Sequence, residues 1–193
     1  TLGTLPLASI PVENYGCLIV GNGTKRVKID INGNIIWSKR EFNYFNSSLY
    51  SVTNANDGGF IACGAVDLPA KAYLLKFDSL GNFVWNKEFT AIGNFVFYNI
   101  TQAYTDGYLV CGYENNGVIN KGILIRLDNN GNEIWRKYPI PSIRFHSCNT
   151  IRKFRNDFVI VGGADTSFVI RIDTNGNTQY FSAIEPPPGS VGF

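Results

Sequence analysis

The stretch at residues 30–37, Asp-Ile-Asn-Gly-Asn-Ile-Ile-Trp, is the most informative part of the sequence because the chain repeats it three more times. The copies stand at 78–85, 128–135 and 173–180, where they read DSLGNFVW, DNNGNEIW and DTNGNTQY. They therefore begin 48, 50 and 45 residues apart. A unit that recurs every ~40 to 50 residues is typical of a propeller blade, which buries its apolar faces only by stacking on its neighbours.

Each unit predicts four short strands, of which the first is weak and lies near 8–12, 51–55, 99–103 and 149–153. The second strand of a unit is a continuous apolar run, as in Phe60-Ile61-Ala62-Cys63, and such a run indicates a strand that is covered on both faces. The third strand alternates apolar and basic residues, which indicates one packed face. We therefore predict an all-β propeller of four-stranded antiparallel blades, four of them in this chain. The four repeats fill most of residues 1–184, at about 5–40, 49–88, 97–138 and 147–182, and a Pro-rich linker or tail follows at 185–193.

The repeated motif itself predicts the hairpin between the third and fourth strands. Its Asn-Gly pair supplies the positive φ of a tight turn, and its Asp can bond the backbone two residues on. The spacing also resembles a calcium loop, but Leu80 replaces a ligand and no bidentate Glu follows, so we interpret the turn as structural and expect no metal. The basic residue two before each Asp recurs in every unit, which favours a structural ion pair. An aromatic residue then marks each outermost strand: Trp37, Trp85, Trp135 and Tyr180.

Composition excludes several classes of function. The chain has 193 residues, 45% of them hydrophobic and 17% charged, and a formal net charge of +2. It lacks the basic bias of a nucleic-acid-binding protein and any apolar run near the ~18 residues of a membrane span. Methionine is absent, so we expect a processed chain or an internal piece of a longer one, with an extracellular or cell-surface location. The mass of the native polypeptide would decide between a fragment and a complete protein.

Cysteine and histidine give no sign of catalysis. Cys63 and Cys111 each precede the same glycine of the repeat, so we expect buried free thiols, while the pairing of Cys17 and Cys148 stays open. His146 is the only histidine, which argues against a metal centre, and it has no evident third group to complete a Cys–His nucleophile. We therefore predict no catalytic residues, no metal and no cofactor.

Length variation points to one face as the binding face. The distance from Asp to the aromatic residue is always 7, whereas the loop from the second to the third strand changes from unit to unit. Insertions of this kind collect on one face, which often binds partners. The aromatic connections between units open on the same side; they hold Phe42, Tyr44, Phe45 and Tyr50, then Phe89, Phe95, Phe97 and Tyr98, then Tyr138, Arg144, Phe145 and His146. The candidate contact residues are Tyr44, Phe45, Asp67, Tyr73, Phe95, Tyr113, Asn115, Asn116, Arg144 and His146.

The motif Asp-x-x-Gly-Asn-x-x-Trp-x-Lys, with Lys39, Lys87 and Lys137 after the tryptophans, resembles the blade repeat of secreted bacterial β-propellers. It is related to the blades of pyrroloquinoline-quinone propellers, and the resemblance covers nearly all of residues 5–182. It implies an exported binding or scaffolding module of the kind found in surface proteins of gliding-type bacteria, with a protein partner or a surface glycan, as part of a larger polypeptide or complex. A lectin is one alternative. A quinone-dependent dehydrogenase is the other, but the Thr of those turns, an adjacent cysteine pair and half of those enzymes' units are missing.

Overall fold

The computed structural model describes residues 5–12, 16–41, 46–139, 146–164 and 167–184, which form four antiparallel four-stranded sheets and no helix. The first sheet, blade 1, has strands β1 (Pro6–Val12), β2 (Gly16–Gly21), β3 (Arg26–Ile29) and β4 (Ile35–Lys39). Blade 2 has β5 (Ser47–Asn54), β6 (Phe60–Val66), β7 (Lys71–Phe77) and β8 (Phe83–Phe89). Blade 3 has β9 (Phe95–Gln102), β10 (Tyr108–Asn115), β11 (Asn120–Leu127) and β12 (Glu133–Lys137). Blade 4 has β13 (His146–Phe154), β14 (Asp157–Ala164), β15 (Ser167–Ile172) and β16 (Thr178–Ile184).

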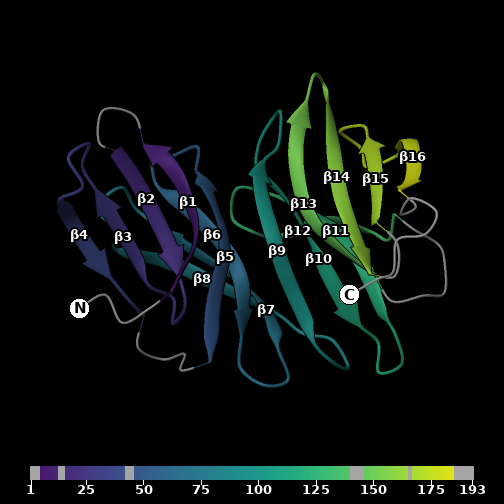
Figure 1. Cartoon of the computed structure of the whole chain (residues 1–193), viewed down its shortest axis with the longest axis horizontal. Coiled ribbons are helices and arrows are strands. Elements are labelled where there is room, and N and C mark those ends of the chain that lie inside the picture. Colours follow the sequence, from purple (N-terminus) through teal and green to yellow (C-terminus); the bar gives the residue numbers. More distant parts are fainter. Residues whose placement is uncertain (1–4, 13–15, 42–45, 140–145, 165–166, 185–193) are drawn as a thin grey trace, which may run out of the picture.

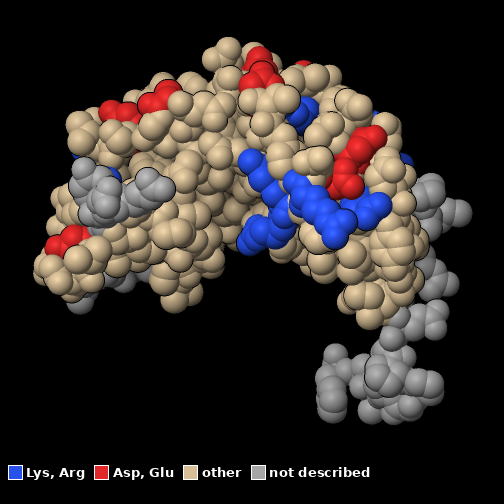
Figure 2. Space-filling model, turned by 90° about the horizontal axis from the view of Figure 1, so that it is seen from above, with Lys and Arg blue, Asp and Glu red and all other residues tan. Residues whose placement is uncertain are grey.

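The four blades stand side by side in an arc. Within each blade the strands pair in chain order, and the first strands, β1, β5, β9 and β13, follow one another along the inner side. Figure 1 shows blades 1 and 2 in one half of the molecule and blades 3 and 4 in the other. Figure 2 shows the same arc from above, with a hollow on its inner side. Among the described residues no comparable packing joins β13 back to β1.

The inner strands extend further than the sequence suggested. We expected them near 8–12, 51–55, 99–103 and 149–153, yet each starts two to four residues earlier. Each contains a register shift at the same place, which leaves Tyr50 of β5 and Tyr98 of β9 without a paired residue opposite. A bulge of this kind takes up one extra residue and lets pairing continue. Residues 95–98, expected in an aromatic connection, therefore lie inside β9.

Three apolar cores lie between the blades, and they confirm the predicted cover on both faces for the second strands of blades 2 and 3. The second strands of blades 1 and 4 are covered on one face only, because each of these blades has a neighbour on one side among the described residues. In β6, Ile61 faces the core shared with blade 3 and Ala62 faces the core shared with blade 1, and both side chains are fully buried. Stacked blades provide this double cover because each sheet buries one face against the preceding blade and the other against the next.

The Asp of the repeated motif organises its own turn. In blade 2, Asp78 Oδ1 accepts hydrogen bonds from the amides of Leu80, at 2.9 Å, and Asn82, at 2.8 Å, while Oδ2 accepts one from Asn82 Nδ2 at 2.9 Å. The basic residue two positions before this Asp does not pair with it, although the repeated spacing suggested such an ion pair. Lys76 Nζ lies 2.8 Å from Asp57, in the turn between the first and second strands. In the same way, Arg126 pairs with Asp106 and Arg171 pairs with Asp157, and not with the Asp of the motif that follows each arginine.

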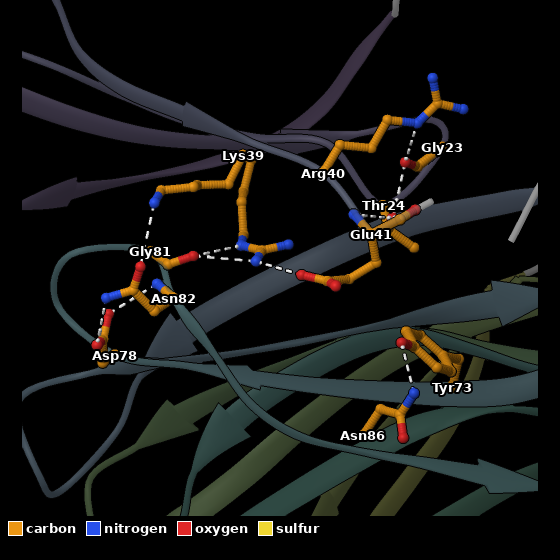
Figure 3. A network of polar contacts seen from close by, with 11 residues as sticks. Gly23, Thr24, Lys39, Arg40, Glu41, Tyr73, Asp78, Gly81, Asn82 and Asn86 are labelled. Atoms are coloured by element: carbon orange, nitrogen blue, oxygen red, sulfur yellow. Dashed lines mark hydrogen bonds and ion pairs between the residues drawn. The ribbon is translucent and has the colours of Figure 1, made fainter. Parts of the chain in front are cut away.

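A second repeated contact joins each blade to the next. Trp85 of β8 lies against the glycine of the following motif, because a Cβ added at Gly131 would sit 2.7 Å from its ring. Two residues on, Lys87 donates a hydrogen bond to Asn132 of that motif. Trp37 and Lys39 hold Gly81 and Asn82 in the same way: Lys39 Nζ donates to Asn82 Oδ1 at 3.1 Å, a contact drawn in Figure 3. Trp135 and Lys137 hold Gly176 and Asn177. We call this paired contact the Trp–Lys clamp.

Candidate functional site

A groove of about 730 Å³ lies between blades 1 and 2, on the side of the loops that join second strands to third strands. This is the face that the variable loop lengths predicted. Its lining comes from the loop after β2, from the start of β5 and from the loop after β6. The residues that line it are Leu5, Asn22, Gly23, Arg40, Asn46, Ser47, Ser48, Tyr50, Ala65, Asp67, Leu68 and Ala70.

One wall of the groove is held by hydrogen bonds between the two blades. The Gly23 amide donates to the carbonyl of Ser47 at 2.7 Å, and Ser48 Oγ donates to Asn22 Oδ1 at 3.1 Å. Arg40 Nε donates to the Gly23 carbonyl at 3.0 Å, and Figure 3 shows this contact. The rest of the Arg40 guanidinium stays exposed beside the groove. This wall therefore presents fixed backbone and one positive charge.

The loop after β6 adds a carboxylate and an apolar side chain to the groove lining. Asp67 has φ of 64°, a conformation uncommon for non-glycine residues, and its amide donates to the carbonyl of Asn46 at 2.9 Å. Lys71 Nζ lies 3.1 Å from Asp67 Oδ2 and 3.2 Å from Glu88, and these hydrogen bonds raise the pKa of Lys71. Leu68, next to Asp67, is 80% exposed. The loop after β6 therefore presents a charged and an apolar side chain to solvent next to each other.

A row of tyrosines leads from the groove toward blade 3. The rings of Tyr50 and Tyr98 lie 5.8 Å apart, and those of Tyr98 and Tyr113 lie 5.7 Å apart. All three rings are half-buried. Burial raises the pKa of Tyr98 and Tyr113, so their hydroxyl groups stay protonated at neutral pH. Such a row offers apolar area and hydrogen-bonding groups at low entropic cost, which is why tyrosine is frequent at interfaces.

The structure places some of the predicted contact residues at this surface and buries others. Asp67 lines the groove and Tyr113 ends the tyrosine row. Tyr73 and Phe95 are fully buried between blades, so a contact role for them does not fit their position. The sequence reasoning failed there because it placed both in exposed loops, whereas the strands extend through them. Tyr44, Phe45 and Arg144 lie outside the described residues.

Two predicted residues shape a neighbouring loop. Asn115 Nδ2 donates to Asn120 at 2.7 Å, and its Oδ1 accepts from the Gly117 amide at 2.7 Å. Asn116 Oδ1 accepts from the amide of Ile119 at 3.0 Å. Asn116 is exposed, whereas Asn115 is mainly engaged within the loop after β10. Asn115 thus fixes the shape of the loop, and the loop presents the Asn116 side chain to solvent.

His146 begins β13 and is 8% exposed. Its Nε2 is buried and has no hydrogen-bond partner among the described residues. Cys148, two residues on in the same strand, is fully buried, and burial raises the pKa of its thiol to about 12. A thiol in that state is a poor nucleophile at neutral pH. The four cysteines are free, and Cys63 and Cys111 are buried as predicted.

The sequence placed Tyr50 and Tyr98 in the aromatic connections of the predicted binding face but did not single them out as contact residues. Tyr50 and Tyr98 stand 48 residues apart, the same interval as the first two motifs, so they occupy equivalent places in successive blades. The matched interval is the signal that could have singled them out. What no pattern showed is that both fall on the bulged residue of an inner strand, which turns the rings toward each other.

A basic surface lies on the inner side of the arc, where Figure 2 shows Lys and Arg side chains gathered at the hollow. Strand β13 exposes Arg152 and Lys153 there. Both contact blade 3: Arg152 donates to Asn99 Oδ1 at 2.9 Å, and Lys153 lies 5.0 Å from the Tyr104 ring. These cations therefore contribute to the joint between blades 3 and 4.

Within the described ranges, no cluster of three or more His, Cys, Asp or Glu side chains could hold a metal ion. None of the described segments is a helix long and apolar enough to cross a membrane.

No protein-family model matches the chain, and no curated protein matches its sequence. Solved structures do resemble it. The WD40 domain of Pan2 from Neurospora crassa aligns with a TM-score of 0.65 at 14% identity, over 91% of this chain and 51% of that one. BamB from Moraxella catarrhalis aligns with a TM-score of 0.56 at 15% identity, over 97% of this chain and 54% of that one. The chain thus spans about half the length of these two propellers. The likeness confirms the predicted fold class, a β-propeller of four-stranded blades.

Proposed function

We propose that this protein is a non-enzymatic binding or scaffolding module, and that the groove between blades 1 and 2 takes a segment of a protein partner. The groove, with its continuation along the tyrosine row, is the observation that carries the proposal. It combines a cation at Arg40, a carboxylate at Asp67 and an exposed apolar side chain at Leu68 on fixed backbone. Aromatic and apolar anchors with a charged rim are what protein interfaces use.

Selection from a displayed library of random peptides tests this function. Peptides enriched on the wild-type protein should bind Tyr50→Ala and Asp67→Ala variants at least about tenfold more weakly, since each change removes a groove contact. Tyr180→Ala is the matched control, because Tyr180 is exposed on β16, in blade 4, and should leave binding unchanged. Peptides that bind all three variants equally would show that the groove is not the site.

The same groove variants separate a lectin from a protein-binding module. Tyrosine rings also stack on sugars, so a glycan array probed with wild type and with Tyr50→Ala gives the second arm of the test. Glycan binding that Tyr50→Ala abolishes, without any selected peptide, would favour the lectin. For the quinone-dependent dehydrogenase, a visible absorbance band and dye-linked oxidation by the purified protein would be required.

We further propose that the protein acts outside the cell or at its surface. The support is the resemblance of the blade motif to repeats of exported bacterial propellers. Fractionation of the source cells, followed by detection of the protein in the medium or at the surface, tests this. Recovery only from the cytoplasm would contradict it.

A further inference from the structure

Three of the four motif turns lie under a Trp–Lys clamp, and the turn of blade 1 does not. Gly81, Gly131 and Gly176 are buried, and a Cβ added at any of them would lie 2.6 to 2.8 Å from a tryptophan ring atom. Gly33 is exposed, and a Cβ added there would meet nothing within 4 Å.

The uncovered turn is nevertheless built like the others. Asp30 Oδ1 accepts from the amides of Asn32, at 2.9 Å, and Asn34, at 2.8 Å, and Oδ2 accepts from Asn34 Nδ2 at 3.0 Å. In the covered turns the remaining amide oxygen of this Asn accepts a hydrogen bond from the clamp lysine. Asn34 Oδ1 has no donor among the described residues. The turn of blade 1 therefore has the same groups that bind the Trp–Lys clamp in the other three turns.

The sheet beside this turn is only partly covered: Ile19 and Ile29 are half-buried, although Val27 is 5% exposed. Blade 1 turns Ile19, Val27 and Ile29 away from blade 2, and these side chains line an apolar hollow of about 400 Å³ that reaches Gly33 and Ile35. At the equivalent places blade 2 has Ala62, Leu75 and Phe77, which are all fully buried against blade 1. The hollow and the turn together form one surface, which we call the blade-1 socket.

The chain's own last blade does not match the socket. Where blades 1 to 3 carry Trp and Lys, blade 4 carries Tyr180 and Ser182, and Ser182 Oγ donates to the carbonyl of Ala183 at 3.3 Å. Serine is too short to replace the lysine that reaches across to the next turn. We propose that the blade-1 socket binds a further propeller blade whose outer strand carries Trp-x-Lys, in preference to blade 4 of a second copy. The three internal joints are the template for this contact.

Cys17 provides a probe of the socket. It alternates with Ile19 on β2, so it lies on the same face of the sheet. Its counterparts Phe60 and Tyr108 are 3% and 1% exposed beneath neighbouring blades, whereas Cys17 is half-buried. The other three thiols are fully buried, so Cys17 is the accessible one among the four.

The experiment places a blade from the same chain against the blade-1 socket. A copy of residues 93–146, which carries Trp135 and Lys137, is joined directly ahead of residue 5, and labelling of Cys17 by a thiol reagent is followed by peptide mass spectrometry. We expect labelling to slow by at least about tenfold, because access then requires the joint to open. The matched control has Trp135→Tyr and Lys137→Ser in the appended copy only, as in blade 4, and should lose most of that protection. Equal protection by both, or by neither, would overturn the proposal.

A second pair of variants guards against misfolding of the fused chain. The unfused protein should sediment as a monomer of 21.4 kDa, since blade 4 lacks the clamp, and a wild-type dimer protected at Cys17 would show that a second copy fills the socket. The Tyr180→Trp/Ser182→Lys variant should gain concentration-dependent self-association, and Asn34→Ala in that background should weaken it. No gain in association would count against recognition of Trp-x-Lys.

Discussion

Gly131 and Gly33 hold the same place in the same turn, with positive φ of 74° and 84°, yet Gly131 lies under the ring of Trp85 and Gly33 faces solvent. The two turns share their Asp-centred hydrogen bonds almost to the tenth of an ångström. What differs is the neighbour. The comparison teaches that one repeat encodes two surfaces, a clamp on its outer strand and a receptor at its turn. The clamp stabilises only when it meets the next blade, and the receptor only when it meets the preceding one.

The largest expected effect comes from removing the clamp ring at a filled joint. Trp85→Ala should lower the free energy of unfolding by about 3–5 kcal/mol, because the ring packs against the core shared by blades 2 and 3 and covers Gly131. Urea denaturation followed by circular dichroism measures this. Tyr180→Ala is the matched change at the unfilled end, where the ring is 54% exposed, and should cost less than about 1 kcal/mol. Similar losses at both positions would contradict the comparison.

The glycines give the next effect. Gly131→Ala should cost about 2–4 kcal/mol, since a left-handed alanine is strained and the Trp85 ring must also move. Gly33→Ala meets the same backbone strain but no ring, so about 1 kcal/mol is expected. The difference between the two variants, from paired urea titrations, isolates the contribution of the ring contact. This difference between the two stability losses should vanish when both glycine variants are made in a Trp85→Ala background.

Arg26 is a second difference between blade 1 and the other blades, because it is a buried arginine where blades 2 and 3 have leucine. It is 1% exposed, it donates to the Gly81 carbonyl at 3.0 and 3.1 Å, and it lies 2.6 Å from Glu41. Blades 2 and 3 have buried leucines at this place, Leu74 and Leu124. Arg26→Ala should cost about 2–4 kcal/mol, because it leaves a cavity and unpaired polar groups. Arg26→Leu should cost less, about 1 kcal/mol, since an apolar side chain of similar reach fills the site. Equal costs in thermal unfolding would show that polar pairing, and not filling, dominates.

The fold was open to prediction because the repeat acts through local chemistry. The Asn-Gly turns, the apolar second strands and the aromatic outer strands each have a short-range cause, so the blades followed from the sequence. The candidate site was harder to predict from the sequence. Tyr73 and Phe95 looked like loop residues, because the bulges that prolong the inner strands depend on pairing between strands and leave no mark in composition. Asp67 lines the groove and Tyr113 belongs to the tyrosine row, and loop length had pointed to both, but their role in binding stays a prediction.

The smallest expected effect concerns the carboxylates of the two turns. Asp128 loses part of its hydration, which raises its pKa, but hydrogen bonds from Asn132 and the charge of Lys87 outweigh this and lower the pKa overall. The pKa of Asp30 is lowered first by the Asn34 side chain, without a clamp lysine. A lowered pKa stabilises the folded state above the unfolded-state pKa of about 3.9, and this stabilisation is lost as the pH falls through the folded-state pKa. Lys87→Ala should therefore raise the pKa of Asp128 and leave that of Asp30 unchanged, as carboxyl NMR titration would show. An equal rise at both would mean that the lysine acts through the net charge of the protein and not through the joint it closes.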